Sequence, residues 1–294
     1  MDTSKIDPRI YALYDQYCHS SMKRREFLKR ASTIAVVGGT GLAMAEALLP
    51  NYAAAQTISF TDPRIKATYK TYDSPGGNSG EMRGYLVQPA GEGPFPAVLV
   101  IHENRGLNPY IEDVARRAAV AGFLAFAPDG LWPAGGYPGN DDDGKVLQAG
   151  LDRGKIHVDM LNGAKFLKSH PLSNGKLGAT GFCFGGGVVG YLAVEMGADL
   201  NAGVPFYGRQ PADADVARIK APLLAHYAEQ DPRVNAGIDS FEAALKANGV
   251  SHEIHVYPGT NHGFHNNSTP RYDEAAAKLA WERTTAFFAA NLAG

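Results

Sequence analysis

The segment Gly181-Phe-Cys183-Phe-Gly-Gly-Gly187 constrains the fold more than any other part of the chain. It follows a strand-like stretch, Lys176–Thr180, and precedes a helix-like stretch, Val188–Met196. Glycines around a central residue let the backbone turn sharply, because they have no Cβ to clash in strained conformations. Such a turn presents its central side chain at the tip of a sheet, beside a helix N-terminus. The pattern predicts that Cys183 is a nucleophile; a buried structural cysteine in a Gly-rich turn is the alternative.

Composition excludes several classes of protein. Of the 294 residues, 45% are hydrophobic and 20% are charged, which is typical of a globular protein rather than a disordered or fibrous one. The formal net charge is only −2, and nucleic-acid-binding proteins usually carry a concentrated basic face. We therefore expect no nucleic-acid partner.

Residues 1–55 have the pattern of an export signal. Lys23-Arg24-Arg25 is followed by a weakly apolar stretch, Ala31–Leu49, and then by the small-residue site Ala53-Ala54-Ala55. This order is typical of a cleaved signal peptide, and the paired arginines indicate the twin-arginine export machinery. We therefore expect a periplasmic or secreted protein without a stable membrane anchor. An amphipathic surface helix that begins near Arg24 is the alternative.

The two cysteines fall on either side of this boundary. Cys18 lies in the segment predicted to be removed, so Cys183 would be the only thiol of the mature chain. A single cysteine cannot form an intrachain disulfide, even in an oxidising compartment. A chemical role for Cys183 is therefore more plausible than a structural one.

Residues 56–294 are predicted to form one α/β domain in which strands and helices alternate. Alternation of this kind favours a mostly parallel sheet with helices on both faces, and ligands that bind at the carboxyl ends of the strands. The strands are expected at 65–72, 83–88, 97–101, 123–127, 176–180, 202–206, 222–227 and 252–257, and the helices at 111–121, 145–168, 188–196, 238–248 and 272–290, with a long loop over 128–144.

A thiol nucleophile requires a base and an acid that orients the base. Asp231 directly follows the predicted strand 222–227, and His262 follows the last predicted strand. The order nucleophile, acid, histidine along the chain is typical of one large class of hydrolytic enzymes. Spacing alone does not exclude Glu229 as the acid or His265 as the base.

A further acidic residue is expected near the thiol. Glu103 follows the strand 97–101, in the position where hydrolytic enzymes of this class place part of an oxyanion hole. The backbone amides of Asn104 and Phe184 are the candidate oxyanion donors. A surface carboxylate paired with an arginine is the alternative for Glu103. Of the two H-x-x-H pairs, the one at 252–255 lies on a predicted strand, where its histidines face opposite sides, and the one at 262–265 lacks a third ligand nearby, so no metal is expected.

Together these residues resemble the dienelactone hydrolase (carboxymethylenebutenolidase) family, which has the α/β-hydrolase fold. The resemblance rests on the Gly181–Gly187 segment, Glu103, Asp231 and His262-Gly-Phe, and it extends over most of residues 60–290. It implies a catalytic triad of Cys183, His262 and Asp231, with Glu103 acting on the ionisation of the thiol. It also implies oxyanion donors at Asn104 and Phe184, and a reaction without a cofactor.

The chain departs from the family where substrate is held. Members of the family bind the substrate carboxylate with two arginines; here the first region reads Gly130-Leu-Trp-Pro-Ala-Gly, and the second position is Asn266. An amide cannot replace the charge of a guanidinium. Dienelactone is therefore not the expected substrate. Replacement substrate contacts are predicted at Arg105, Arg209 and Tyr137, with Arg271 as a further candidate.

The sequence thus predicts a hydrolase that cleaves an ester or a lactone. A non-catalytic binding protein on the same scaffold is one alternative, because fold does not determine function. A redox-active thiol protein is another, although the mature chain would lack a second cysteine to resolve an oxidised one.

Overall fold

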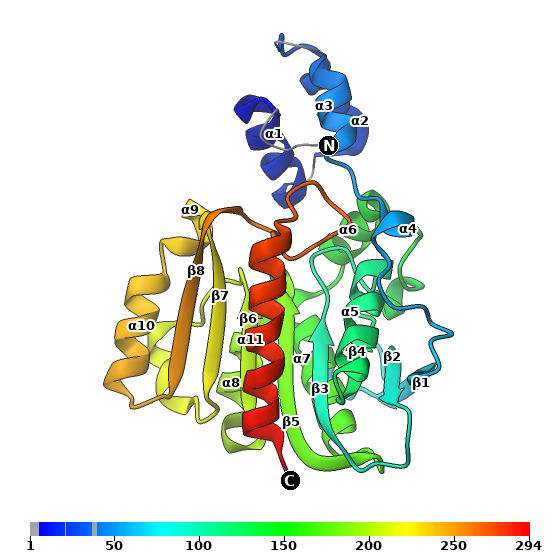
Figure 1. Cartoon of the computed structure of the whole chain (residues 1–294), viewed down its shortest axis with the longest axis vertical. Helices are drawn as coiled ribbons and strands as arrows, with labels where there is room; N and C mark the ends of the chain where they lie inside the picture. Colours follow the sequence, from blue (N-terminus) through cyan, green and yellow to red (C-terminus); the bar gives the residue numbers. More distant parts are fainter. Residues whose placement is uncertain (1–5, 21, 37–39) are drawn as a thin grey trace.

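The computed structural model describes residues 6–20, 22–36 and 40–294. The described residues form an eight-stranded sheet in the order β1-β2-β4-β3-β5-β6-β7-β8 (Figure 1). β1, β2 and β4 pair antiparallel, and the strands from β4 to β8 are parallel. The mostly parallel sheet predicted from the alternation of elements is confirmed. The strands are Ile65–Asp73, Glu81–Pro89, Phe95–Ile101, Leu124–Pro128, Ser173–Phe182, Ala202–Phe206, Leu223–Gln230 and His252–Asn261 for β1 to β8.

Helices cover both faces of the sheet (Figure 1). Apolar residues of α7 and α8 pack on one face, and those of α5 and α11 pack on the other. The central strands are buried on both sides: every residue from Ala97 to Ile101 in β3 is fully buried, as a continuous apolar run predicts. The helices of this part are α5 Pro109–Val120, α6 Asp141–Gly150, α7 Arg153–Lys168, α8 Phe184–Met196, α9 Pro232–Asn235, α10 Ile238–Ala247 and α11 Glu274–Leu292, with short 3₁₀ turns at Trp132–Ala134, Gly197–Asp199 and Asp213–Arg218.

The prediction of a single helix over 145–168 is wrong. Two helices, α6 and α7, occupy this stretch, and α6 begins within the predicted loop at Asp141. Leu151 has an extended backbone, and the Asp152 side chain accepts a hydrogen bond from the Lys155 amide at 3.0 Å. An aspartate in this position caps a helix N-terminus, so it starts a new helix rather than continuing the old one.

The N-terminal residues are folded against the rest of the chain. They form helices α1 Pro8–His19, α2 Arg24–Ser32, α3 Gly41–Ala47 and α4 Tyr52–Ala55. The helix expected near Arg24, as the alternative to a signal, is present as α2. We call α1, α2 and α3 the N-terminal cap; in Figure 1 it stands above the carboxyl ends of the strands. Residues 1–5, 21 and 37–39 of the stretch predicted as a signal lie outside the described residues, and the boundary at 55 stays a prediction.

No helix in the described part of the chain is both long and apolar enough to cross a bilayer. The two arginines of the predicted export motif, Arg24 and Arg25, are exposed in the first turn of α2.

Candidate active site

Cys183 lies in the turn between β5 and α8, at the carboxyl end of the sheet. Its backbone has φ 55° and ψ −109°, a left-handed conformation that costs a non-glycine residue on the order of 1–3 kcal/mol. The surrounding glycines make the turn possible. A Cβ on Gly181 would lie 2.3 Å from the carbonyl oxygen of Gly185, and one on Gly185 would lie 2.4 Å from that of Ile101. The tight strand–turn–helix unit predicted from the sequence is therefore present.

Asp231 and His262 form a buried pair at the same edge. Gln230 of β7 pairs with Asn261 of β8, so the next residue of each strand faces the other. His262 Nδ1 and Asp231 Oδ2 are 2.5 Å apart, and both residues are 4% exposed. Burial raises the pKa of Asp231, but the hydrogen bond to His262 and the charges of His262 and Arg233 outweigh it and leave that pKa below its ordinary value. An ionised carboxylate of this kind holds a histidine in one orientation.

The two competitors for these positions have other partners. Glu229 is exposed, and its Oε2 accepts a hydrogen bond from the Gly259 amide at 2.8 Å. His265 is buried against Phe182 and Phe206, and its Nδ1 lies 2.7 Å from the hydroxyl of Tyr110. The geometry therefore favours Asp231 and His262, which bind each other.

Glu103 lies beside the thiol and is buried. Its Oε2 accepts a hydrogen bond from Asn266 Nδ2 at 3.1 Å. Burial raises the pKa of Glu103 above its ordinary value, against the opposing charges of Arg105 and Arg271. Burial, and after it the charge of Glu103, raises the pKa of Cys183 to about 12. The resting thiol is therefore protonated at neutral pH, and the surface ion pair considered for Glu103 is absent among the described contacts.

The predicted oxyanion donors follow two neighbouring strands, since Ile101 of β3 pairs with Gly181 of β5. Phe184 is the first residue of α8, and its amide bonds to Cys183. Asn104 follows Glu103 after β3, and its side chain donates a hydrogen bond to the carbonyl oxygen of Cys18 in α1 at 3.0 Å. Amides at a helix N-terminus stabilise negative charge that develops on a carbonyl oxygen.

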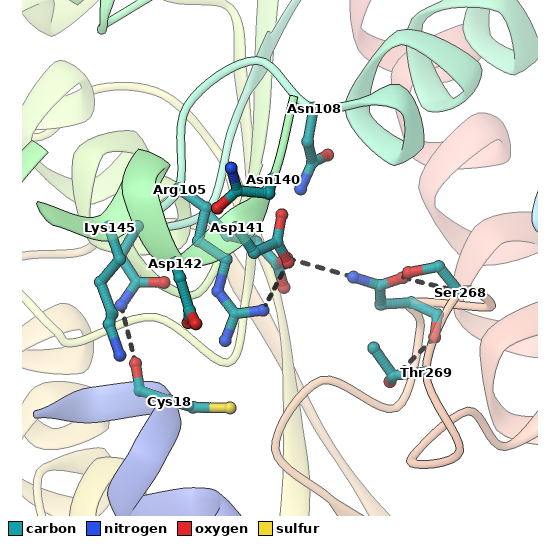
Figure 2. A network of polar contacts seen from close by, with 12 residues as sticks. Cys18, Arg105, Asn108, Asn140, Asp141, Asp142, Lys145, Ser268 and Thr269 are labelled. Carbon is teal, nitrogen blue, oxygen red and sulfur yellow. Dashed lines mark hydrogen bonds and ion pairs between the residues drawn. The ribbon is translucent and has the colours of Figure 1, made fainter. Parts of the chain in front are cut away.

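Of the predicted substrate contacts, Arg105 lies nearest to this chemistry. Its charge lowers the pKa of both Glu103 and Cys183, and its Nη1 binds Asp141 Oδ2 at 2.7 Å (Figure 2). Tyr137 is half-buried and donates to the other oxygen of Asp141 at 3.0 Å. Arg209 is exposed on the segment after β6, with its carbonyl oxygen facing Gly187 of α8. Arg105 and Tyr137 thus share one carboxylate, whereas Arg209 stands apart from them.

Two residues that the sequence analysis did not identify shape the site. His102 Nδ1 lies 2.6 Å from the carbonyl oxygen of Glu103, while its Nε2 accepts a hydrogen bond from the Gly130 amide at 3.1 Å. Burial lowers the pKa of His102 to about 4, so the ring is neutral and fixes the loop that carries Glu103. A histidine between a buried strand and Glu103 was a signal that could have indicated this role.

Tyr207 is the second such residue. It follows β6 with φ 37°, and its ring centroid lies 4.9 Å from that of His262. Burial, and after it the charges of Tyr110, Glu103 and Cys183, raises its pKa well above the ordinary value. Its ring forms the wall behind the histidine. A Tyr-Gly pair directly after a strand was the available sequence signal.

No group of three or more potential metal ligands occurs among the described residues. Of the two histidine pairs, His262 binds Asp231, His265 binds Tyr110, and His255 Nε2 lies 3.5 Å from Glu253.

Two cavities lie at the boundary between the N-terminal cap and α6. The larger, of about 540 Å³, is lined by residues 22–25 and Leu28 of the cap and by Asp142, Asp143, Lys145 and Val146. The smaller, of about 280 Å³, is lined by three tyrosines, Tyr17, Tyr52 and Tyr137, and by residues including Asp141 and Asp142. Neither is lined by Cys183 or His262, so they are not the space in which a substrate would meet the thiol.

Comparison with known proteins agrees with this geometry. Residues 82–292 match the family described as "Dienelactone hydrolase family", and residues 1–37 match one described as "YqhI-like". A Saccharolobus solfataricus protein named "Putative carboxymethylenebutenolidase" is 32% identical over 252 residues, 74% of this chain and 95% of its own. The Escherichia coli "Putative hydrolase fragment YghX" is 63% identical over 114 residues, 38% of this chain and 97% of its own.

A solved structure has the same architecture. The "Putative Dienelactone Hydrolase" of Klebsiella pneumoniae superposes with a TM-score of 0.65 at 27% identity, over 76% of this chain and 98% of its own. The α/β-hydrolase fold predicted from the sequence is confirmed.

Proposed function

Because the chain belongs to the dienelactone hydrolase family, we propose that it hydrolyses an ester or a lactone with Cys183 as the nucleophile. His262 is the general base, Asp231 orients it, and Glu103 controls the ionisation of the thiol. The observation that carries the proposal is the buried Asp231–His262 pair, joined at 2.5 Å, at the same sheet edge as the strained Cys183 turn.

The reaction proceeds in two steps. In the first, the proton of Cys183 Sγ passes to His262, and the sulfur forms a bond to the substrate carbonyl carbon. The amides of Asn104 and Phe184 stabilise the resulting oxyanion, and the C–O bond to the leaving alcohol breaks as His262 returns the proton to it. In the second step His262 takes a proton from water, the hydroxide attacks the thioester, and the acid and the free thiol are released.

Glu103 explains how a protonated thiol is used. The charge of the carboxylate raises the pKa of Cys183, so the uncharged thiol predominates until a bound substrate lowers that pKa. A thiol held neutral at rest is protected from oxidation, because the thiolate is the reactive form.

We further propose that Arg105 and Tyr137 contact the part of the substrate that does not react. Both are bound to Asp141, which neutralises Arg105 in part. We expect the preferred substrate to differ from dienelactone, since the segment 130–135 contains no arginine and Asn266 stands where the family has its second one.

The test is a comparison of the two cysteines. The Cys183→Ala variant is expected to lose turnover of p-nitrophenyl acetate by more than about 10³-fold, whereas the Cys18→Ala variant keeps an acylation burst of one equivalent. Mass spectrometry should find the acyl group on Cys183. Full activity in the Cys183→Ala variant would refute the mechanism. Absence of any burst in the unmodified chain, with its fold intact, would favour the binding protein, and rapid reaction with peroxide without ester turnover would favour the redox protein.

Export by the twin-arginine machinery to the periplasm is a separate proposal. It is supported by the Lys23-Arg24-Arg25 motif and by the exposure of both arginines. Cell fractionation of the unmodified chain and of an Arg24→Lys, Arg25→Lys variant tests it. Equal amounts in the periplasm, or none from either chain, would contradict the proposal.

A further inference from the structure

We propose that the N-terminal cap restricts the approach of substrate to the partly exposed Cys183, and that turnover is faster once the cap has moved away from the strand ends. The inference rests on the proposed function in taking Cys183 as the reacting thiol, and it applies to the chain that retains residues 1–55, before any removal of a signal. Its structural basis is a set of contacts between α1 and the loops that carry the candidate active site (Figure 2).

The last turns of α1 contact residues that adjoin the active site on two sides. On one side, Asn104 Nδ2 donates to the carbonyl oxygen of Cys18, and Asn104 is itself a proposed oxyanion residue. On the other side, Arg271 Nη2 lies 3.8 Å from Cys18 Sγ, and its guanidinium stacks 4.9 Å from the ring centroid of Tyr14. α1 therefore bridges two loops of the site.

Arg271 connects α1 to the catalytic histidine loop. A Cβ on Gly263, the residue after His262, would lie only 3.2 Å from Arg271 Nη2. The charge of Arg271 also lowers the pKa of Glu103, which shows how near this guanidinium is to the carboxyl group beside the thiol. A substrate that approaches Cys183 between Asn104 and the His262 loop would meet α1.

Polar contacts with α6 fasten the cap. Lys145 Nζ donates to the carbonyl oxygen of Tyr17 at the carboxyl end of α1, at 2.7 Å, and to that of Met22 between α1 and α2, at 2.8 Å. Asp142 accepts a hydrogen bond from the hydroxyl of Tyr17 and another from the Arg24 amide at 2.9 Å. Figure 2 shows Lys145 and Asp142 on the side of the network that faces Cys18.

The cap has an apolar core of its own. Ten buried residues between Ile6 and Leu48 form a cluster distinct from the two large clusters that hold the sheet and its helices together. The contacts described between α1 and the domain below are hydrogen bonds, an ion pair, and two cations over tyrosine rings. Interfaces that are polar and separate two cores allow the parts to move relative to each other.

The closed arrangement also contains groups that are imperfectly satisfied. Among the described residues, the hydroxyl of Tyr14 and Nε of Arg271 are buried without a hydrogen-bond partner, and a cavity of about 540 Å³ separates the start of α2 from α6. Buried polar atoms without partners weaken the state that contains them. The polar contacts with α6 thus hold the cap over the site, and the buried polar atoms without partners make it easier for the cap to move away.

The experiment loosens the cap in the full-length chain and follows each thiol separately. In the Asp142→Ala variant the cap loses two hydrogen bonds, while no proposed catalytic residue is changed. The matched control is Asp143→Ala, because Asp143 is the next residue of α6, is exposed, and hydrogen-bonds only to Asn140 within the described part of the chain. Iodoacetamide labelling of Cys18 and Cys183 is quantified by peptide mass spectrometry, beside kcat/KM for p-nitrophenyl acetate.

We expect Asp142→Ala to increase the labelling rates of both thiols and kcat/KM by about tenfold, because hydrogen bonds to a charged group are among the stronger ones. Asp143→Ala should change each by less than about twofold. Lys145→Met removes two further contacts of the cap and should act in the same direction. Circular dichroism and the thermal midpoint of the sheet domain show whether either variant has unfolded.

Two results would overturn the inference. Faster labelling of Cys18 with no change at Cys183 would mean that the cap opens without shielding the thiol. Unchanged labelling of Cys18 in both folded variants would mean that these contacts do not hold the cap. The proposed function fails separately. Faster labelling of Cys183 without ester hydrolysis in any variant would support the inference about the cap and refute the proposal that the protein is a hydrolase.

Discussion

The sheet domain and the N-terminal cap are stabilised in different ways. The sheet domain has two large apolar clusters, one on each face of the sheet, and fully buried central strands. The cap has one small cluster from short helices and is joined to the sheet domain by polar contacts. A segment of about fifty residues buries too little apolar surface to be very stable alone. The sheet domain, which carries the candidate active site, is therefore expected to be much more stable than the cap, which is proposed to control access to it.

The largest expected difference between the two parts is in catalysis. Asp231→Asn should lower kcat for ester hydrolysis by about 10³–10⁴-fold, because an amide cannot stabilise the charged histidine. Asp15→Asn, which changes the exposed partner of Arg271 in the cap, should leave kcat within about threefold. Steady-state kinetics on both variants measures this. Comparable losses would mean that the cap takes part in the chemistry.

Truncation of one buried phenylalanine in each part tests whether they unfold together. Phe206→Ala in β6 and Phe27→Ala in α2 each remove a fully buried ring, at a local cost of about 3–5 kcal/mol. Phe206→Ala should lower the global free energy of unfolding by this amount. Phe27→Ala should instead increase hydrogen exchange in the cap alone. An equal loss of global stability would show that the two parts form one cooperative unit.

The ionisation of the thiol should depend on Glu103. Glu103→Gln removes a negative charge that raises the pKa of Cys183, so the pH profile of iodoacetamide labelling should move to lower pH. At pH 8 the labelling rate should rise by roughly threefold to tenfold, since a full pKa unit is tenfold in thiolate. A shift to higher pH would contradict the assignment. In the unmodified chain the raised pKa of Cys183 favours the fold below pH 9, and this contribution is lost as pH rises toward 12.

The smallest effects concern helix capping. Thr40→Ala in the cap and Asn140→Ala at α6 each remove a side chain that accepts a hydrogen bond from the third residue beyond it, at a cost of about 1 kcal/mol. Hydrogen exchange should increase in α3 for the first and in α6 for the second. Loosening of α6 should also increase labelling of Cys18, because α6 carries Asp142 and Lys145. Absence of that increase would show that α6 does not hold the cap in place.

Local patterns were sufficient to predict the sheet and the order of the site residues. The apolar run at 97–101 and the glycines around Cys183 determine their conformations through nearby atoms. Asp231 and His262 could be placed because parallel strands deliver their carboxyl ends to one edge.

Long-range contacts could not be predicted in this way. Asn266 binds Glu103 across 163 residues, and Tyr17 binds Asp142 across 125. Residues 1–55 have a pattern that fits both an export signal and amphipathic helices, and only their tertiary contacts distinguish a docked helix from an extended leader. The break between α6 and α7 depends on the side chain of Asp152, which caps α7, whereas the helical spacing of the sequence continues across it.

The pairing of Gln230 with Asn261 has a mechanical consequence. Asp231 and His262 directly follow these two paired residues. A bend of the sheet edge at β8 therefore displaces the acid and the base together. Damage to that edge should therefore change the distance from His262 to the sulfur while the carboxylate–imidazole bond survives. An inactive variant of this kind would still show the downfield proton resonance of the Asp231–His262 hydrogen bond, which makes that resonance a measure of edge integrity independent of turnover.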